Sequence, residues 1–228
     1  EKEKRMIQAI FYKEWIKTRW YLLLATLFMI GITGYSMLRV SRVIAMQGID
    51  HLWVVMVQKD AIFVDLLQYV PLLTGILLAA VQFFPEMQRK CLKLTLHLPY
   101  SQKKMILAIL AFGLLALAAC FATSFIIMGI YLPQHFTGEL VRHILLSAVP
   151  WFLAGGAGYL FVAWICLEPT WKRRVLNLII AALICRIYFL APAPEAYNSF
   201  LPVLTLYTLL IASLSWISVV RFKAGKQD

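Results

Sequence analysis

The chain has 228 residues, of which 62% are hydrophobic and 14% charged, and its mean hydropathy is +0.78. Soluble domains rarely exceed about half apolar residues, so this composition excludes an ordinary soluble protein. A net charge of +11 would favour nucleic-acid binding in a soluble chain, but here the basic residues separate long apolar runs. We therefore predict an integral membrane protein, surrounded by membrane lipid and without a nucleic-acid partner.

Residues 1–19 combine basic side chains with an apolar stripe at helical spacing. The stripe consists of Ile7, Ile10, Phe11 and Trp15, and Lys13 and Lys17 lie opposite it. This pattern predicts an amphipathic helix in the membrane interface that leads into the first span. A solvated basic tail is the alternative, which Trp15 and Trp20 disfavour.

Six apolar runs are each long enough to cross a hydrocarbon core of roughly 30 Å. They predict spans at about 20–38, 61–85, 105–131, 144–167, 175–191 and 200–220. The whole of 1–228 is then a single transmembrane domain of the all-α class. Residues 39–60 contain an apolar core too short to cross, so we expect an external loop with an interfacial helix.

Two groups of glycines lie inside these runs. Gly31 and Gly34 share one face of the first span, and we expect close helix packing there. The cluster Gly155-Gly156-Ala157-Gly158 either lets two backbones approach or provides a gating hinge, and we favour packing.

Most of the 22 Lys and Arg residues lie in the N-terminal segment, in 86–104, in 168–174 and in the C-terminal tail. Six spans place all four segments on the same side of the membrane. Because short cytoplasmic loops collect Lys and Arg, we expect the termini on the cytoplasmic side of a plasma (inner) membrane.

Sequence motifs for catalysis are absent. There is no Gly-x-x-x-x-Gly-Lys-Ser/Thr loop for nucleotide phosphates and no HExxH or other metal-ligand spacing around the four histidines. The four cysteines form no CxxC pair, so neither a disulfide framework nor a zinc site is expected. The chain is thus predicted to hold no metal and no catalytic residue.

Only Asp65 and Arg186 are ionisable groups well inside the predicted spans. A charge in the membrane is costly and is usually paired, snorkelled or functional. Both residues are expected in the outer half of the membrane, so we predict a structural Asp65–Arg186 pair or snorkelling, with a substrate contact as the alternative.

The segment 86–104 is a short basic insert between two long apolar runs. Read as a helix over about 87–98, it has an apolar stripe of Met87, Cys91, Leu94 and Leu98. Its basic residues lie mostly on the other side: Arg89, Lys90, Lys93 and His97. Pro99 cannot continue this helix, and Ser101 is placed to cap the next one. We predict a helix that lies along the membrane surface between two spans.

Four features occur together in this sequence. A basic amphipathic N-terminal helix precedes six spans, Glu86 begins the second cytoplasmic segment, and that segment ends with Leu98-Pro99-Tyr100-Ser101-Gln102-Lys103-Lys104. This pattern resembles the membrane subunit of type-2 ATP-binding-cassette (ABC) exporters.

The resemblance implies a permease that pairs with separate ABC ATPase subunits and with a second permease subunit, as a homodimer or heterodimer. ATP and Mg would be bound by the ATPase, and this chain would hold no cofactor. The segment between spans two and three would be the coupling helix that contacts the ATPase. By position, its contact residues would be Glu86, Arg89, Leu92, Lys93, Leu94, His97, Leu98 and Pro99.

The path should be mostly apolar, so we expect a lipid, a peptide or a hydrophobic drug as substrate. Two other classes remain open at this point: an ATPase-independent secondary transporter or channel, and a membrane scaffold subunit.

Overall fold

The computed structural model of the chain describes residues 2–59, 64–88, 101–191 and 195–223. The α-helices are α1 (Lys2–Lys59), α2 (Val70–Gln88), α4 (Gln102–Tyr131), α5 (Gly138–Leu167), α6 (Trp171–Cys185) and α7 (Leu201–Lys223). Three short 3-10 helices are η1 (Asp65–Leu67), η2 (Leu132–Gln134) and η3 (Arg186–Phe189). No strand occurs within the described ranges, so the predicted all-α class is confirmed.

Within the described ranges, five helical segments are long and apolar enough to cross a membrane. They are Lys4–Met46, Asp65–Gln88, Gln102–Gln134, Gly138–Leu167 and Leu201–Lys223. These segments correspond to five of the six predicted spans. The agreement has a physical reason: in lipid the backbone N–H and C=O groups of a long apolar run find hydrogen-bond partners only within a helix.

The remaining predicted span, 175–191, forms a shorter helix. α6 has 15 residues and is followed by the four-residue η3. At 1.5 Å per residue, α6 alone is about 22 Å long, which is less than the hydrocarbon thickness. It packs against α5 at the edge of the bundle and leaves large side chains such as Leu176 and Leu183 exposed.

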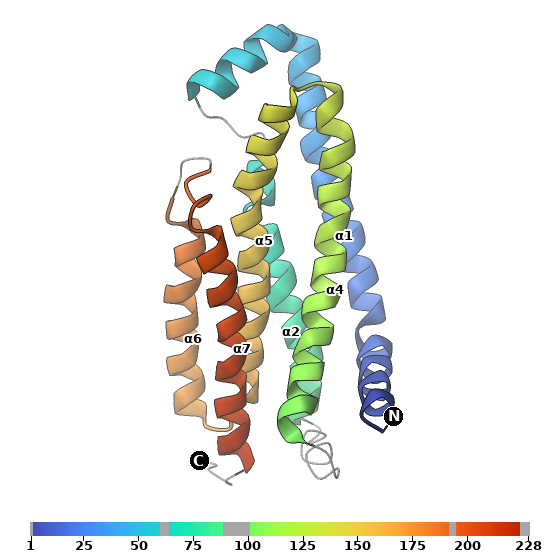
Figure 1. Cartoon of the computed structure of the whole chain (residues 1–228), viewed down its shortest axis with the longest axis vertical. Coiled ribbons are helices and arrows are strands. Elements are labelled where there is room, and N and C mark those ends of the chain that lie inside the picture. The colour runs from blue at the N-terminus through green and yellow to red at the C-terminus, as the bar shows by residue number, and fades with distance from the viewer. Residues whose placement is uncertain (1, 60–63, 89–100, 192–194, 224–228) are drawn as a thin grey trace.

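The first helix differs from the prediction. α1 runs without a break from the basic N-terminal residues into the apolar run, and it stays helical up to Lys59 across a kink at Gly48. The backbone there has φ 80° and ψ 164°, a conformation that glycine adopts without a Cβ clash. The loop expected in 39–60 is not formed before Gly48, because residues 39–47 continue α1. The helix expected in the same segment is present: Figure 1 shows the part after Gly48 as a helix that turns across the end of the bundle, and its position in the membrane interface stays a prediction. The interfacial position of residues 1–19 stays a prediction.

α5 lies at the centre of the bundle and contacts α2, α4, α6 and α7, while α1 packs against α4 and α2 (Figure 1). The first turn of α1 and the last turn of α7 lie at the same end of the molecule. The turn between α5 and α6 lies at this end as well, and we refer to it as the terminal end.

Glycines bring α2 and α5 into close contact. A Cβ on Gly75 would overlap the carbonyl oxygen of Gly155, and one on Gly155 would lie 2.6 Å from the carbonyl oxygen of Pro71. A Cβ on Gly158 would lie 2.7 Å from a methyl group of Leu72. The cluster at 155–158 thus permits close helix packing, the favoured interpretation.

The packing expected at the other glycine pair is not formed within the described chain. A Cβ added to Gly31 or Gly34 would meet nothing within 4 Å. The sequence identifies small residues on one face, but it does not say whether another helix covers that face.

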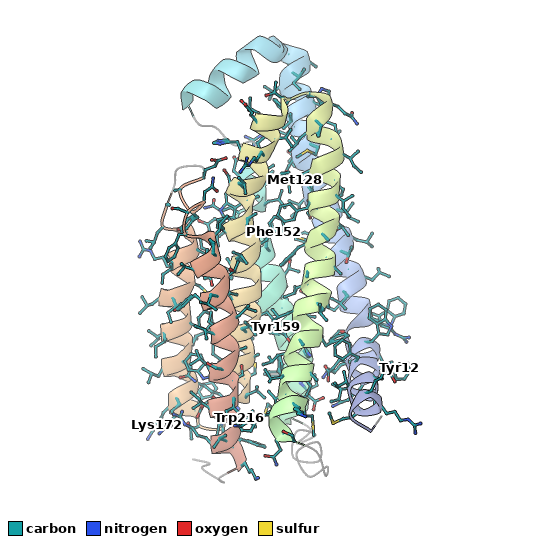
Figure 2. All side chains as sticks on the ribbon, viewed as in Figure 1. Tyr12, Met128, Phe152, Tyr159, Lys172 and Trp216 are labelled. Atoms are coloured by element: carbon teal, nitrogen blue, oxygen red, sulfur yellow. The ribbon has the colours of Figure 1, made fainter. Side chains whose placement is uncertain are left out.

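The interior is apolar and aromatic along the whole bundle. Met128, Phe152 and Tyr159 lie at successive heights between the helices, whereas Tyr12 and Lys172 point outward (Figure 2). Large apolar side chains also cover the outside, with Leu206, Leu209 and Leu210 on α7 all more than half exposed. An apolar exterior of this kind suits contact with lipid.

Candidate functional site

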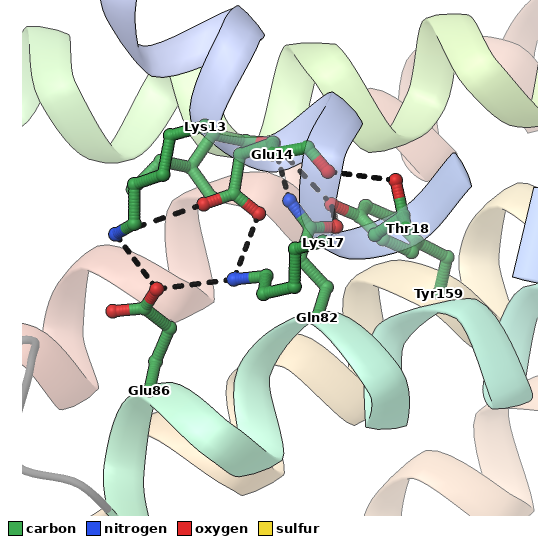
Figure 3. A network of polar contacts seen from close by, with 8 residues as sticks. Lys13, Glu14, Lys17, Thr18, Gln82, Glu86 and Tyr159 are labelled. Carbon is green, nitrogen blue, oxygen red and sulfur yellow. Dashed lines mark hydrogen bonds and ion pairs between the residues drawn. The ribbon is translucent and has the colours of Figure 1, made fainter. Parts of the chain in front are cut away.

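A cluster of four charged side chains lies near the terminal end and joins α1 to the last turn of α2. Lys13 and Lys17 are four residues apart and share a face of α1, with Glu14 beside them. Glu86 is two residues before the end of α2 and points toward this face (Figure 3). We call these four residues the charge cluster.

Positively and negatively charged side chains alternate around the charge cluster. Lys13 Nζ lies 2.7 Å from Glu86 Oε1, and Lys17 Nζ lies 3.0 Å from the same oxygen. Lys17 Nζ is also 2.9 Å from Glu14 Oε2, and Lys13 Nζ is 3.9 Å from Glu14 Oε1. Two ammonium groups therefore face two carboxylates, and the cluster as a whole is neutral.

Burial distinguishes these pairs from ordinary surface ion pairs. The Glu14 side chain is fully buried, that of Glu86 is 7% exposed and that of Lys17 is 20% exposed, whereas Lys13 is 45% exposed. Removing one partner of a buried pair leaves an uncompensated charge in a low-dielectric interior. The cluster thus joins the N-terminal part of α1 to the end of α2 through poorly exposed ion pairs.

A second polar layer lies next to the charge cluster and extends it to two more helices. The Tyr159 hydroxyl of α5 donates a hydrogen bond to Gln82 Oε1 of α2 at 2.8 Å, and Gln82 Nε2 donates to the Ile109 carbonyl of α4 at 3.1 Å. Gly113 makes room for this arrangement, because a Cβ there would overlap the Tyr159 hydroxyl. Together the two layers connect α1, α2, α4 and α5 (Figure 3).

Another buried carboxylate lies at the same end, where α5, α6 and α7 meet. Glu168 follows α5 directly and is fully buried; its carboxylate accepts hydrogen bonds from Ser218 and Thr170 and lies 3.5 Å from Arg221. Arg174 Nε donates to the Glu168 backbone carbonyl at 2.6 Å. The basic turn at 168–174 is thus fixed to the end of α7.

Of the residues assigned to the coupling helix, the structure describes Glu86 alone. Arg89, Leu92, Lys93, Leu94, His97, Leu98 and Pro99 lie outside the described residues. Ser101 occupies the N-cap position of α4, but its side chain makes no capping hydrogen bond, contrary to expectation.

The predicted pair between Asp65 and Arg186 is replaced by a different one. Asp65 pairs with Arg39 of α1 at 3.5 Å, and no ion pair joins it to Arg186 in the described structure. Asp65 lies in η1, before α2 begins at Val70, and α1 continues far enough to bring Arg39 close. Both side chains are about half exposed, 46% for Arg39 and 58% for Asp65, so the contribution of this pair to stability is small.

The sequence interpretation missed Glu14, Gln82 and Tyr159. Glu14 is an acidic residue within a basic segment, and Gln82 interrupts an apolar run, so both carried a signal. What the pattern could not supply was the partner, because Lys17 and Glu86 are 69 residues apart in the chain.

The bundle and its buried polar layers define a class: a helical protein with several membrane-spanning segments, compatible with a multi-pass membrane protein. Comparison with models of known protein families, with curated proteins and with solved structures gives no match.

Proposed function

We propose that this chain is the transmembrane permease subunit of an ABC exporter. It would form the translocation path with a second permease subunit and be driven by a separate ATPase that binds ATP and Mg. The spans, the resemblance of 86–104 to a coupling helix and the absence of catalytic motifs support the proposal. We place the chain in the inner membrane with both termini in the cytoplasm.

The observation that carries the proposal is the charge cluster, because it lies at the point where α2 leads into 86–104. A force applied to that segment would first reach Glu86. Lys13 and Lys17 would pass it to α1, and the hydrogen bonds of Gln82 would pass it to α4 and α5. The terminal end of the bundle would then tilt as a unit and change the side on which the path opens.

The test uses a double variant, Leu94→Asp with Leu98→Asp, in the complex purified with its ATPase. Two carboxylates on the apolar stripe of the coupling helix should weaken its contact with the ATPase. We expect either loss of ATPase from the complex or ATP hydrolysis that no longer supports transport. Both would be measured on reconstituted vesicles.

Met46→Asp is the control, because it places an acidic residue at an exposed apolar position at the opposite end of the segment Lys4–Met46 from the charge cluster. It should leave ATPase binding unchanged. Normal transport and ATPase retention by the double variant would show that 86–104 is not the coupling element.

A further inference from the structure

A groove runs along the outside of the bundle between α1 and α4, with a volume of about 880 Å³. Volumes of about 300–1,000 Å³ are typical of pockets for small molecules. On α1 the groove is lined by Trp15, Arg19, Trp20, Leu23 and Leu27. On α4 it is lined by Phe112, Leu115, Ala116, Ala119, Cys120 and Thr123.

One part of this groove is purely apolar. Leu23, Leu27 and Leu115 are each at least half exposed and face outward. The hydroxyl groups nearby are already used, since Thr26 donates to the Leu22 carbonyl at 2.7 Å and Thr123 to the Cys120 carbonyl at 2.7 Å. This part offers a ligand nothing but hydrocarbon contact.

Among the described residues, Arg19 is the single charged group that lines the groove. Its guanidinium lies 5.7 Å from the centre of the Trp20 ring, and no carboxylate of the described chain lies within ion-pair distance of it. Lys13, Lys17, Arg39 and Arg221, by contrast, all have carboxylate partners. Arg19 is also the last basic residue before the apolar run that begins at Trp20.

A cation flanked by two tryptophans and continued by an apolar channel matches an amphipathic anion. Tryptophan is enriched where membrane headgroups lie, and basic pockets between membrane helices bind anionic headgroups. In a bilayer, the molecules that contact an outward-facing groove are lipids. Charge complementarity with Arg19 selects among them those with a net negative headgroup.

We propose that the groove between α1 and α4 binds a membrane phospholipid with a negatively charged headgroup. Its phosphate lies against Arg19 between Trp15 and Trp20, and an acyl chain lies along Leu23, Leu27 and Ala119. This site does not depend on the proposed transport function.

A second groove serves as an internal comparison. It lies between α4, α5 and α7, has a volume of about 750 Å³ and is lined by no charged residue. Ala118 lines this second groove, whereas its neighbour Ala119 lines the first, and both are exposed. The two alanines therefore provide a matched pair of positions at which a bulky side chain fills one groove or the other.

The test is native mass spectrometry of the purified full chain, titrated with an equimolar mixture of phosphatidylglycerol and phosphatidylcholine of identical acyl chains. We expect the wild type to retain phosphatidylglycerol about fivefold over phosphatidylcholine, the preference that one basic residue near the membrane surface supplies. Arg19→Gln should reduce the ratio to near one, whereas Arg42→Gln, an exposed arginine on α1 outside the groove, should leave it unchanged.

Ala119→Phe should remove one bound phosphatidylglycerol, and Ala118→Phe should not. Equal retention of the two lipids by the wild type would overturn the proposal, as would equal ratios for the Arg19 and Arg42 variants or equal losses for the two alanine variants. Gel filtration and circular dichroism establish which variants fold. If a phenylalanine variant does not fold, the comparison of Arg19→Gln with Arg42→Gln tests the proposal by itself.

Discussion

A fully buried carboxylate such as Glu14 is stable among apolar helices only because positive charges lie against it. Lys17 at 2.9 Å supplies most of that compensation, and Glu86 in turn balances the two lysines. The four side chains therefore depend on one another. Loss of any one of them changes the net charge of a poorly hydrated site.

Glu86→Gln tests this dependence at the level of the residue. The amide keeps the size of the side chain but removes the charge that both lysines face, so the cluster acquires a net positive charge. We expect the free energy of unfolding to fall by about 1–3 kcal/mol, the range for leaving a buried polar group without its partner. Thermal unfolding in detergent measures the change.

Glu139→Gln is the matched control, because Glu139 is exposed on α5. The melting temperature of this variant should equal that of the wild type. Equal melting temperatures for the two glutamine variants would mean that the charge cluster contributes nothing to stability.

At the scale of the residue, the sequence identifies the polar side chains, but it does not predict which of them are in contact. Lys13 and Lys17 read as the solvated face of an interfacial helix, because nothing local indicates that Glu86 lies beside them. Asp65 was misplaced for a related reason. The sequence interpretation placed it several residues inside a span and close to Arg186, whereas in the structure Asp65 is the first residue of the membrane-crossing segment, in η1 before α2 begins, and lies close to Arg39.

At the scale of the elements, the contact between α2 and α5 depends on the absence of side chains. Gly75→Ala would force a methyl group into the carbonyl of Gly155, and backbone atoms cannot move aside without separating the helices. We expect a loss of about 1–3 kcal/mol or more, the usual cost of overpacking. Unfolding in detergent again provides the measurement.

Gly31→Ala is the corresponding control, since a Cβ there meets nothing within 4 Å. Alanine is the better helix former by roughly 0.5–1 kcal/mol, so this variant should be as stable as the wild type or more so. Equal melting temperatures for the two alanine variants would contradict the close contact between α2 and α5.

The elements themselves were largely predictable, since long apolar runs form helices in lipid whatever their neighbours are. The exceptions have physical causes. Residues 39–60 carry charges that suggested a loop, yet α1 continues through most of them and bends at Gly48. The run at 175–191 was long enough to predict a full span, but its α-helix ends at Cys185 and gives way to the tighter η3.

At the scale of the whole molecule, the terminal end contains the first turn of α1, the last turn of α7, the charge cluster and Glu168 with its partners. The proposed function requires 86–104 to be at this end on the cytoplasmic side.

Lys93→Cys, in a chain whose native cysteines are replaced, should react with a membrane-impermeant maleimide only in inside-out vesicles. Glu139→Cys, one span away, should react only in intact cells. The reverse pattern would leave the coupling segment without an ATPase to contact.

The most direct measurement of the central claim is purification of the tagged full chain from its native membrane in a mild detergent, followed by assay of what accompanies it. The account predicts an ATPase subunit in stoichiometric amount, with ATP hydrolysis that the Leu94→Asp, Leu98→Asp variant loses or uncouples. A chain that purifies alone and moves substrate across vesicles without ATP would contradict it.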